Sequence, residues 1–325
     1  MLEASLDPRL VGRATPRKRL HVIAIAAGMA ITSAIPAHAI IFERLVDCCP
    51  MSPTIYYGVN YPSLSPDGCV LAYTDVTTYP WHYEWWPHIV LSSQCGGPGG
   101  SVHPPEHVNG WVQMPEWSPD GRFLAFVAGG YGPTIGIYIY DTIFGMYQRI
   151  EDTQWVMSLA WTQDGQSIVY QVLDALYRVD VQGGAPVTLG VAGEEPTCGP
   201  DNAVAFVRGS DLWILADNGQ ERQLTNTLAI ESSPAWSPDG KWIAFASDRS
   251  GNVDIWITAA TGGTAVQITT DPAQEYQPSW SGNSRLVFAR FNAINDEDIW
   301  LATDLPDWTI PVESRSWGTV KSLYR

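Results

Sequence analysis

Basic residues are scarce in this chain of 325 residues, which has 18 Lys and Arg against 34 Asp and Glu and a formal net charge of −16. A surface this acidic repels nucleic acids and anionic membranes. We therefore expect no nucleic-acid partner, and we expect any protein or peptide partner to be neutral or basic. Much of the acidic charge also serves solubility.

Motifs of nucleophilic catalysis and of nucleotide binding are also missing. The chain has no G-x-S-x-G elbow, which would carry the serine of an α/β-hydrolase. It has neither a Walker loop nor a G-x-G-x-x-G that follows a strand. No long stretch beyond the N-terminus has helical periodicity. These absences favour a non-enzymatic, all-β protein without a cofactor.

Cysteine and histidine are few, with five and six residues. No C-x-x-C pair occurs, which argues against a zinc ribbon. Cys69 and Cys95 fall in one predicted blade and are the first candidates for a disulfide, while the other pairings stay open. His103 and His107 are the candidate metal ligands, but the two prolines between them prevent a shared helix face. We expect no metal.

The N-terminus carries the pattern of an export signal. Arg17-Lys-Arg19 is a basic region, the stretch 20–35 is apolar, and Ala37-His-Ala39 is a small-residue cleavage site. A membrane anchor is the alternative, but the apolar run is short for a span. We predict a signal peptide over 1–39, a periplasmic or extracellular location, and no membrane span after cleavage.

One unit recurs six times along the rest of the chain. Its clearest copy, Ser233-Pro-Ala-Trp-Ser-Pro-Asp-Gly-Lys-Trp-Ile-Ala-Phe-Ala-Ser247, predicts two strands joined by a tight turn. Pro sets φ in such a turn, Asp bonds to nearby backbone, and Gly accepts a positive φ. Aligned on its Trp, the copies fall at Leu64, Trp117, Trp161, Cys198, Trp236 and Trp280. Six units of roughly forty residues predict a six-bladed β-propeller.

A third strand follows each copy, at 88–91, 136–140, 175–179, 211–215, 254–258 and 298–302. We expect the propeller to span 55–312, after an N-terminal segment 40–54 and before a tail 313–325, and we expect a monomer. The strand that closes the ring is either 52–57 or 308–312, and the sequence does not decide between them.

The pattern W-S-P-D-G-(x)2-I-A-F, followed by D-I-W and Q-I-T, resembles the WD40-like PD40 repeat of the TolB-like propeller family. The resemblance covers about 55–312. It implies a TolB-like propeller that binds a partner, although a fold does not by itself settle function. The α/β domain that precedes the propeller in TolB has no room here, so we expect a propeller without it.

One carboxylate recurs at the predicted turns. Because a residue repeated around a ring is a structural device, we interpret these aspartates as turn residues rather than catalytic groups. They are Asp67, Asp120, Asp164, Asp201 and Asp239.

Partner-binding residues are expected in two places. The segments before the first strands face one mouth of the channel and carry Glu194, Glu195, Glu231, Glu275 and Tyr276. Since blades two and three have Val112 and Val156 there, the mouth is predicted to be acidic on one half and apolar on the other. Such a mouth suits a basic or amphipathic segment. The second place is the insertion 77–109 of blade one, with Trp81, Trp85 and Trp86, because loops on rigid scaffolds carry specificity.

The function predicted from the sequence is therefore an exported, non-enzymatic propeller that binds a protein or peptide in the cell envelope. The alternative is a glycan lyase or hydrolase that uses the central pocket. That alternative needs His, Arg or acidic groups that converge on the channel.

Overall fold

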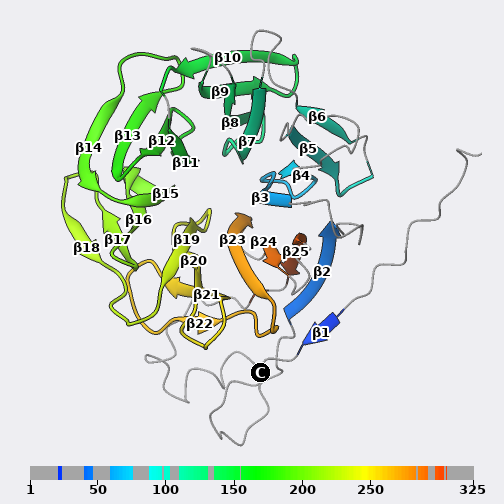
Figure 1. Cartoon of the computed structure of the whole chain (residues 1–325), viewed down its shortest axis with the longest axis vertical. Coiled ribbons are helices and arrows are strands. Elements are labelled where there is room, and N and C mark those ends of the chain that lie inside the picture. The colour runs from blue at the N-terminus through cyan, green and yellow to red at the C-terminus, as the bar shows by residue number, and fades with distance from the viewer. Residues whose placement is uncertain are drawn as a thin grey trace, which may run out of the picture.

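The structure is a computed structural model that describes residues 21–23, 40–46, 59–75, 88–96, 99–102, 110–130, 135–153, 155–282, 285–291, 297–303 and 305. Within these ranges six antiparallel sheets stand around a central axis, and the first strand of each blade is innermost (Figure 1). The predicted six-bladed β-propeller is confirmed. No helix among these residues is long and apolar enough to cross a membrane.

Each blade runs outward from its innermost strand. Blade one contains β3 (Val59–Leu64), β4 (Val70–Asp75), β5 (His88–Ser93) and β6 (Gly100–Val102). Blade two contains β7 (Gly110–Trp117), β8 (Phe123–Gly130), β9 (Gly136–Asp141) and β10 (Met146–Glu151). Blade three contains β11 (Val156–Trp161), β12 (Ser167–Val172), β13 (Ala175–Asp180) and β14 (Val187–Ala192).

The second half of the ring repeats this order. Blade four contains β15 (Glu194–Cys198), β16 (Val204–Arg208), β17 (Asp211–Leu215) and β18 (Glu221–Gln223). Blade five contains β19 (Glu231–Trp236), β20 (Trp242–Ser247), β21 (Asp254–Ala259) and β22 (Val266–Gln267). Blade six contains β23 (Gln274–Ser281), β24 (Arg285–Phe291) and β25 (Glu297–Thr303) from the C-terminal part. All six predicted third strands are present.

The strand that closes the ring is N-terminal. β2 (Ile40–Val46) pairs antiparallel with β25 and supplies the outer strand of blade six. β1 (His21–Ile23), which lies in the predicted signal peptide, pairs with β2 in turn. The closing strand is thus 40–46, inside the segment that we had placed before the propeller. Both ranges proposed for this role, 52–57 and 308–312, lie outside the described residues.

The core lies between the blades. Successive side chains of each second strand point to opposite faces of the blade, so each strand packs against both neighbouring blades. In β20, Ile243 and Phe245 pack with residues of blade four, while Ala244 and Ala246 pack with blade six and β2. The two sets point to opposite faces, as the period of two in a strand requires. Full burial of a side chain such as Phe245 contributes roughly 1.5–3 kcal/mol.

The repeated turns use the hydrogen bonds that the motif suggests. In blades one, two, three and five the aspartate Oδ1 accepts from the hydroxyl of the residue two before it, at 2.5–2.7 Å, and from the backbone N–H two after it. The structure thus places Asp67, Asp120, Asp164 and Asp239 in structural turns.

Asp201 of blade four departs from this arrangement. It lies in a short 3₁₀ turn, η2 (Pro200–Asn202), with φ of 53°. The residue two before it is Gly199, which has no hydroxyl to donate. The indole ring of Trp236 in the next blade packs directly against Gly199, so that a Cβ at this position would lie 2.4 Å from the ring.

Every first strand has an irregularity in its register with the second strand. In five blades the residue three before the aligned Trp position has a positive φ of 50–57°. A proline follows it each time. These residues are Tyr61, Met114, Glu195, Ser233 and Gln277. Such backbone costs about 1–3 kcal/mol per non-glycine residue and clusters at functional sites.

The predicted disulfide between Cys69 and Cys95 is confirmed, with a Cα–Cα distance of 5.0 Å. It links the turn after β3 to the end of β5, within blade one. Cys198 is buried and unpaired.

Candidate functional site

The central channel is the hollow that all six blades enclose. At the end where the first strands finish, it forms a cavity of about 400 Å³ with walls from all six blades. Four aligned tryptophans line it, Trp117, Trp161, Trp236 and Trp280. A second cavity of about 160 Å³ lies next along the first strands, and a third of about 450 Å³ lies where these strands begin. We call the latter end of the ring the mouth face.

Glu116 lies in the wall shared by the first and second cavities. The inner strand β7 places it directly before Trp117, and its Oε2 accepts a hydrogen bond from the Ser63 hydroxyl at 3.1 Å. Its backbone carbonyl accepts the indole N–H of Trp161 at 2.9 Å. Burial raises the pKa of the Glu116 carboxyl to about 7, and the Ser63 bond opposes the rise.

Glu195 lies farther toward the mouth, in the wall shared by the second and third cavities. It occupies the strained position of β15, with φ of 50°. Its carboxylate accepts the backbone N–H of Ser233 in the next blade, and its own N–H donates to the Gln171 side chain at 2.9 Å. Burial raises the pKa of this carboxyl as well.

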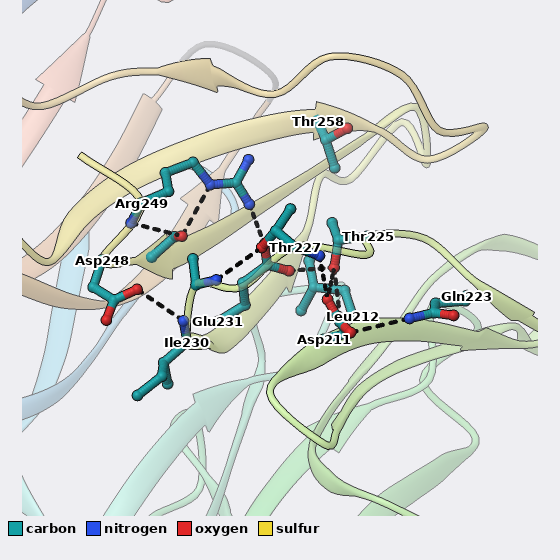
Figure 2. Close-up of polar contacts among 12 residues, drawn as sticks. Asp211, Leu212, Gln223, Thr225, Thr227, Ile230, Glu231, Asp248, Arg249 and Thr258 are labelled. Atoms are coloured by element: carbon teal, nitrogen blue, oxygen red, sulfur yellow. Dashed lines mark hydrogen bonds and ion pairs between the residues drawn. The ribbon is translucent and has the colours of Figure 1, made fainter. Parts of the chain in front are cut away.

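Glu231 does not reach the channel as a free charge. It is only 1% exposed, and its carboxylate pairs with the Arg249 guanidinium and accepts from the hydroxyls of Thr225 and Thr227 (Figure 2). Arg249 also stacks over the ring of Trp256 at 5.0 Å. Burial raises the pKa of Glu231, while Thr225 and Arg249 lower it.

Glu275 repeats this arrangement one blade later. It is 0% exposed and accepts from Arg290 Nε at 3.0 Å and from the Thr269 hydroxyl at 2.7 Å. Arg290 in turn lies 4.1 Å from the ring centroid of Trp300. The prediction of an acidic half of the mouth is therefore wrong at Glu231 and Glu275. Each carboxylate is buried against an arginine, Arg249 in the turn after β20 and Arg290 near the end of β24.

The other predicted mouth residues have different surroundings. Glu194 is exposed at the start of β15. Tyr276 is partly buried, lines the third cavity and donates its hydroxyl to Gln274 at 2.7 Å. Val112 and Val156 are buried in the core. Trp81, Trp85, Trp86, His103 and His107 lie outside the described residues.

Apolar side chains gather on the mouth face instead. Trp155 precedes β11 and Leu173 lies in the β12–β13 turn, beside the same strand end, with exposures of 73% and 65%. Met157, 55% exposed, extends this group into the second cavity. Leu228 and Ile230, which precede β19, are also exposed. The mouth is therefore apolar at blade three, as predicted, but the exposed apolar residues are Trp155 and Met157 and not the buried Val156 between them.

Metal binding finds no support in this geometry. Among the residues that the structure describes, no group of three or more His, Cys, Asp or Glu could hold an ion. The predicted ligands His103 and His107 lie outside that part of the chain.

Glu116 is the site residue that sequence reasoning missed. The six aligned positions directly before the Trp position are Ser63, Glu116, Ala160, Thr197, Ala235 and Ser279. Glu116 is the one charged residue in this set, and the other five are small. A charged residue at a position that is otherwise small is the sequence signal that could have identified Glu116.

Comparisons with known proteins agree with the fold. The model of the tricorn protease N-terminal beta propeller domain matches residues 194–303, the span of blades four to six. The uncharacterized peptidase YuxL of Bacillus subtilis is 28% identical over 216 residues, which cover 60% of this chain and 30% of that protein. The chain therefore spans less than a third of this relative.

Two solved structures share the architecture. TolB from Acinetobacter baumannii has 23% sequence identity and a TM-score of 0.57, over 70% of this chain and 58% of that one. An oligogalacturonate lyase in complex with manganese has 14% identity and a TM-score of 0.53, over 89% and 97%. At such identities the likeness shows the fold alone. The six blades, their repeats and these matches together show that the chain has a β-propeller fold of the TolB-like kind.

Proposed function

We propose that this propeller is a non-enzymatic scaffold that binds a protein or peptide segment across its mouth face. The exposed group of Trp155, Met157 and Leu173 beside the channel carries the proposal. Large apolar side chains gathered on one face of a soluble protein mark interaction sites. Trp is, in addition, the residue type most enriched among the energetic centres of interfaces.

Charge supports a basic or amphipathic partner. Glu194 is exposed beside the mouth, Glu195 lies in its wall, and the chain as a whole carries a net charge of −16. Opposite charge on a partner raises its rate of association and fixes its orientation. We include Tyr276 and the blade-one tryptophans Trp81, Trp85 and Trp86 among the proposed contacts.

We place this binding in the cell envelope or outside the cell, on the strength of the N-terminal export pattern. Cleavage after Ala39 would start the mature chain at Ile40, the first residue of β2. Mass spectrometry of the protein from its own cells should give Ile40 as the N-terminus, in a fraction outside the cytoplasm. An N-terminus upstream of Arg17 on a cytoplasmic protein would refute the export.

Site-specific photo-crosslinking in the producing cells tests the binding. A photoreactive amino acid in place of Leu173 should give discrete adducts with a protein. The matched control replaces Phe144, which is equally exposed at 65% but lies in the β9–β10 turn on the opposite face. Adducts from position 144 and none from position 173 would refute the proposed surface.

A glycan lyase or hydrolase that uses the central pocket is the second candidate. Glu116 favours it, because a channel carboxyl with a pKa of about 7 suits proton transfer near neutral pH. Neutral and uronate-containing oligosaccharides, incubated with the protein with and without Mn²⁺, provide the test. Cleavage that the Glu116→Gln variant lacks would replace the scaffold with an enzyme.

A further inference from the structure

Among the described residues, Glu116 and Glu195, which are half-buried, have no arginine partner, unlike several of the buried carboxylates of the propeller; the buried Asp254, bonded to Ser250 and Gln267, also lacks one. Glu231, Glu275 and Asp298 each pair with an arginine. Within the part of the chain that the structure describes, no Lys, Arg or His pairs with Glu116 or Glu195, whose partners are a serine hydroxyl and a backbone N–H.

The described lining of the channel offers these two carboxylates no compensating charge. Among the described residues that line the three cavities, Glu116 and Glu195 are the charged ones and none is basic. Removing a carboxylate from water without a counter-charge is costly, so buried charges in proteins are normally paired. A cation from outside the chain would supply the missing partner.

The tryptophans of the first cavity point to the same ligand chemistry. Trp117, Trp161, Trp236 and Trp280 line the cavity that Glu116 also lines. Indole rings attract Lys and Arg cations, and aromatic cages bind quaternary ammonium groups. The cavity of about 400 Å³ also lies in the range of small-molecule sites.

We infer that the central channel is a binding site for a basic side chain, an arginine or lysine that the bound segment inserts from the mouth face between Glu195 and Glu116. This inference rests on the proposed binding function and specifies its ligand. Glu195 lies nearer the mouth and would meet the cation first, and Glu116 would hold it beside the tryptophans.

Small probes of the side chain test this directly. Tryptophan fluorescence and calorimetry of the mature chain should detect saturable binding of N-acetyl-arginine amide or N-acetyl-lysine amide. N-acetyl-norleucine amide, which has a similar length and no charge, should bind at least about tenfold more weakly, as expected for the loss of charge-assisted hydrogen bonds. Norleucine amide, with only an α-ammonium group, distinguishes a side-chain site from a site for an amino terminus.

Variants locate the site. Glu116→Gln and Glu195→Gln should each weaken binding of the arginine probe about tenfold. Asp174→Asn removes one exposed carboxylate of the mouth face that lines none of the three cavities, and it should leave binding within about twofold. Circular dichroism of each variant confirms its fold.

Several results would overturn the inference: equal binding of the charged and uncharged probes, preference for the α-ammonium probe, binding unchanged in both glutamine variants, or binding of Ca²⁺ or Mn²⁺ in place of the arginine probe. The crosslinks from position 173 separate the two proposals. If those adducts form but no arginine probe binds, the channel site fails and the mouth-face scaffold stands. If the adducts are also missing, the scaffold fails as well.

Discussion

Glu275 and Arg290 form an ion pair across β23 and β24 in which neither side chain is more than 8% exposed. Arg290 Nη2 lies 2.9 Å and Nε 3.0 Å from the same carboxylate oxygen. The partnership explains why a glutamate that the repeat places at the mouth of the channel contributes no charge to it.

Removing one member of this pair should be costly. Glu275→Ala leaves Arg290 buried with Asp271 at 3.4 Å as its remaining acidic partner. We expect a loss of about 3–5 kcal/mol in the free energy of unfolding, because the buried guanidinium loses its buried partner and keeps only the partly exposed Asp271. Urea unfolding followed by tryptophan fluorescence measures it. The double variant Glu275→Ala/Arg290→Met should recover more than half of the loss, and a single-variant loss below about 1 kcal/mol would contradict the role of the pair.

Glu116 should make the folded state less stable as the pH rises. Its pKa is raised from 4.5 to about 7 on folding, so the folded state holds the extra proton between these values and loses stability as the pH rises through them. Glu116→Gln should therefore raise the free energy of unfolding at pH 8 by roughly 2–3 kcal/mol, at about 1.4 kcal/mol per pKa unit, and change it little at pH 4.

Denaturant curves of wild type and variant across pH 4–8 measure this difference. The exposed substitution Asp174→Asn serves as the control and should show no comparable divergence. A Glu116→Gln variant that is less stable than wild type at pH 8 would show that the carboxylate is a structural group after all.

The closing strand should contribute strongly to stability. Phe42 on β2 is 2% exposed and meets Phe288 of β24 edge to face, with ring centroids 6.4 Å apart. Phe42→Ala should cost about 3–5 kcal/mol in thermal or urea unfolding. Val187→Ala on β14, an outer strand where this side chain is 64% exposed, should change stability by less than about 0.5 kcal/mol. Equal effects of the two substitutions would argue against closure by β2.

The disulfide should stabilise the fold by restricting the conformational freedom of the unfolded chain. Cys69 and Cys95 close a loop with a sequence separation of 26. Chain-entropy reasoning gives about 3.5 kcal/mol for a loop of this size. The double variant Cys69→Ser/Cys95→Ser should melt well below the oxidised protein in scanning calorimetry. Wild type in reductant should match it, and a melting temperature that reductant does not change would contradict this contribution.

A turn motif that recurs along the chain at a spacing of roughly forty residues was enough to predict most of the fold. The Asp-Gly turn has local chemistry that recurs in four blades as one hydrogen-bond pattern, centred on Asp67, Asp120, Asp164 and Asp239. The closing strand was missed because its pairing joins Ile41 to Thr303 and Phe42 to Ala302, across nearly the whole chain. No local pattern at 40–46 specifies that partner.

For the candidate site, the sequence predicted the positions of residues but not their partners. The repeat determined where Glu195, Glu231 and Glu275 enter the ring, because the turn and the two-residue period of strands are local properties. Tertiary packing decided which of these carboxylates remains available to a ligand. Arg249, which follows β20, pairs with Glu231, and Arg290 in β24 pairs with Glu275. Glu116 and Glu195 instead face a channel whose described lining contains no basic residue. Pairing and burial depend on neighbours that are distant in sequence, so they emerge only when the ring is closed.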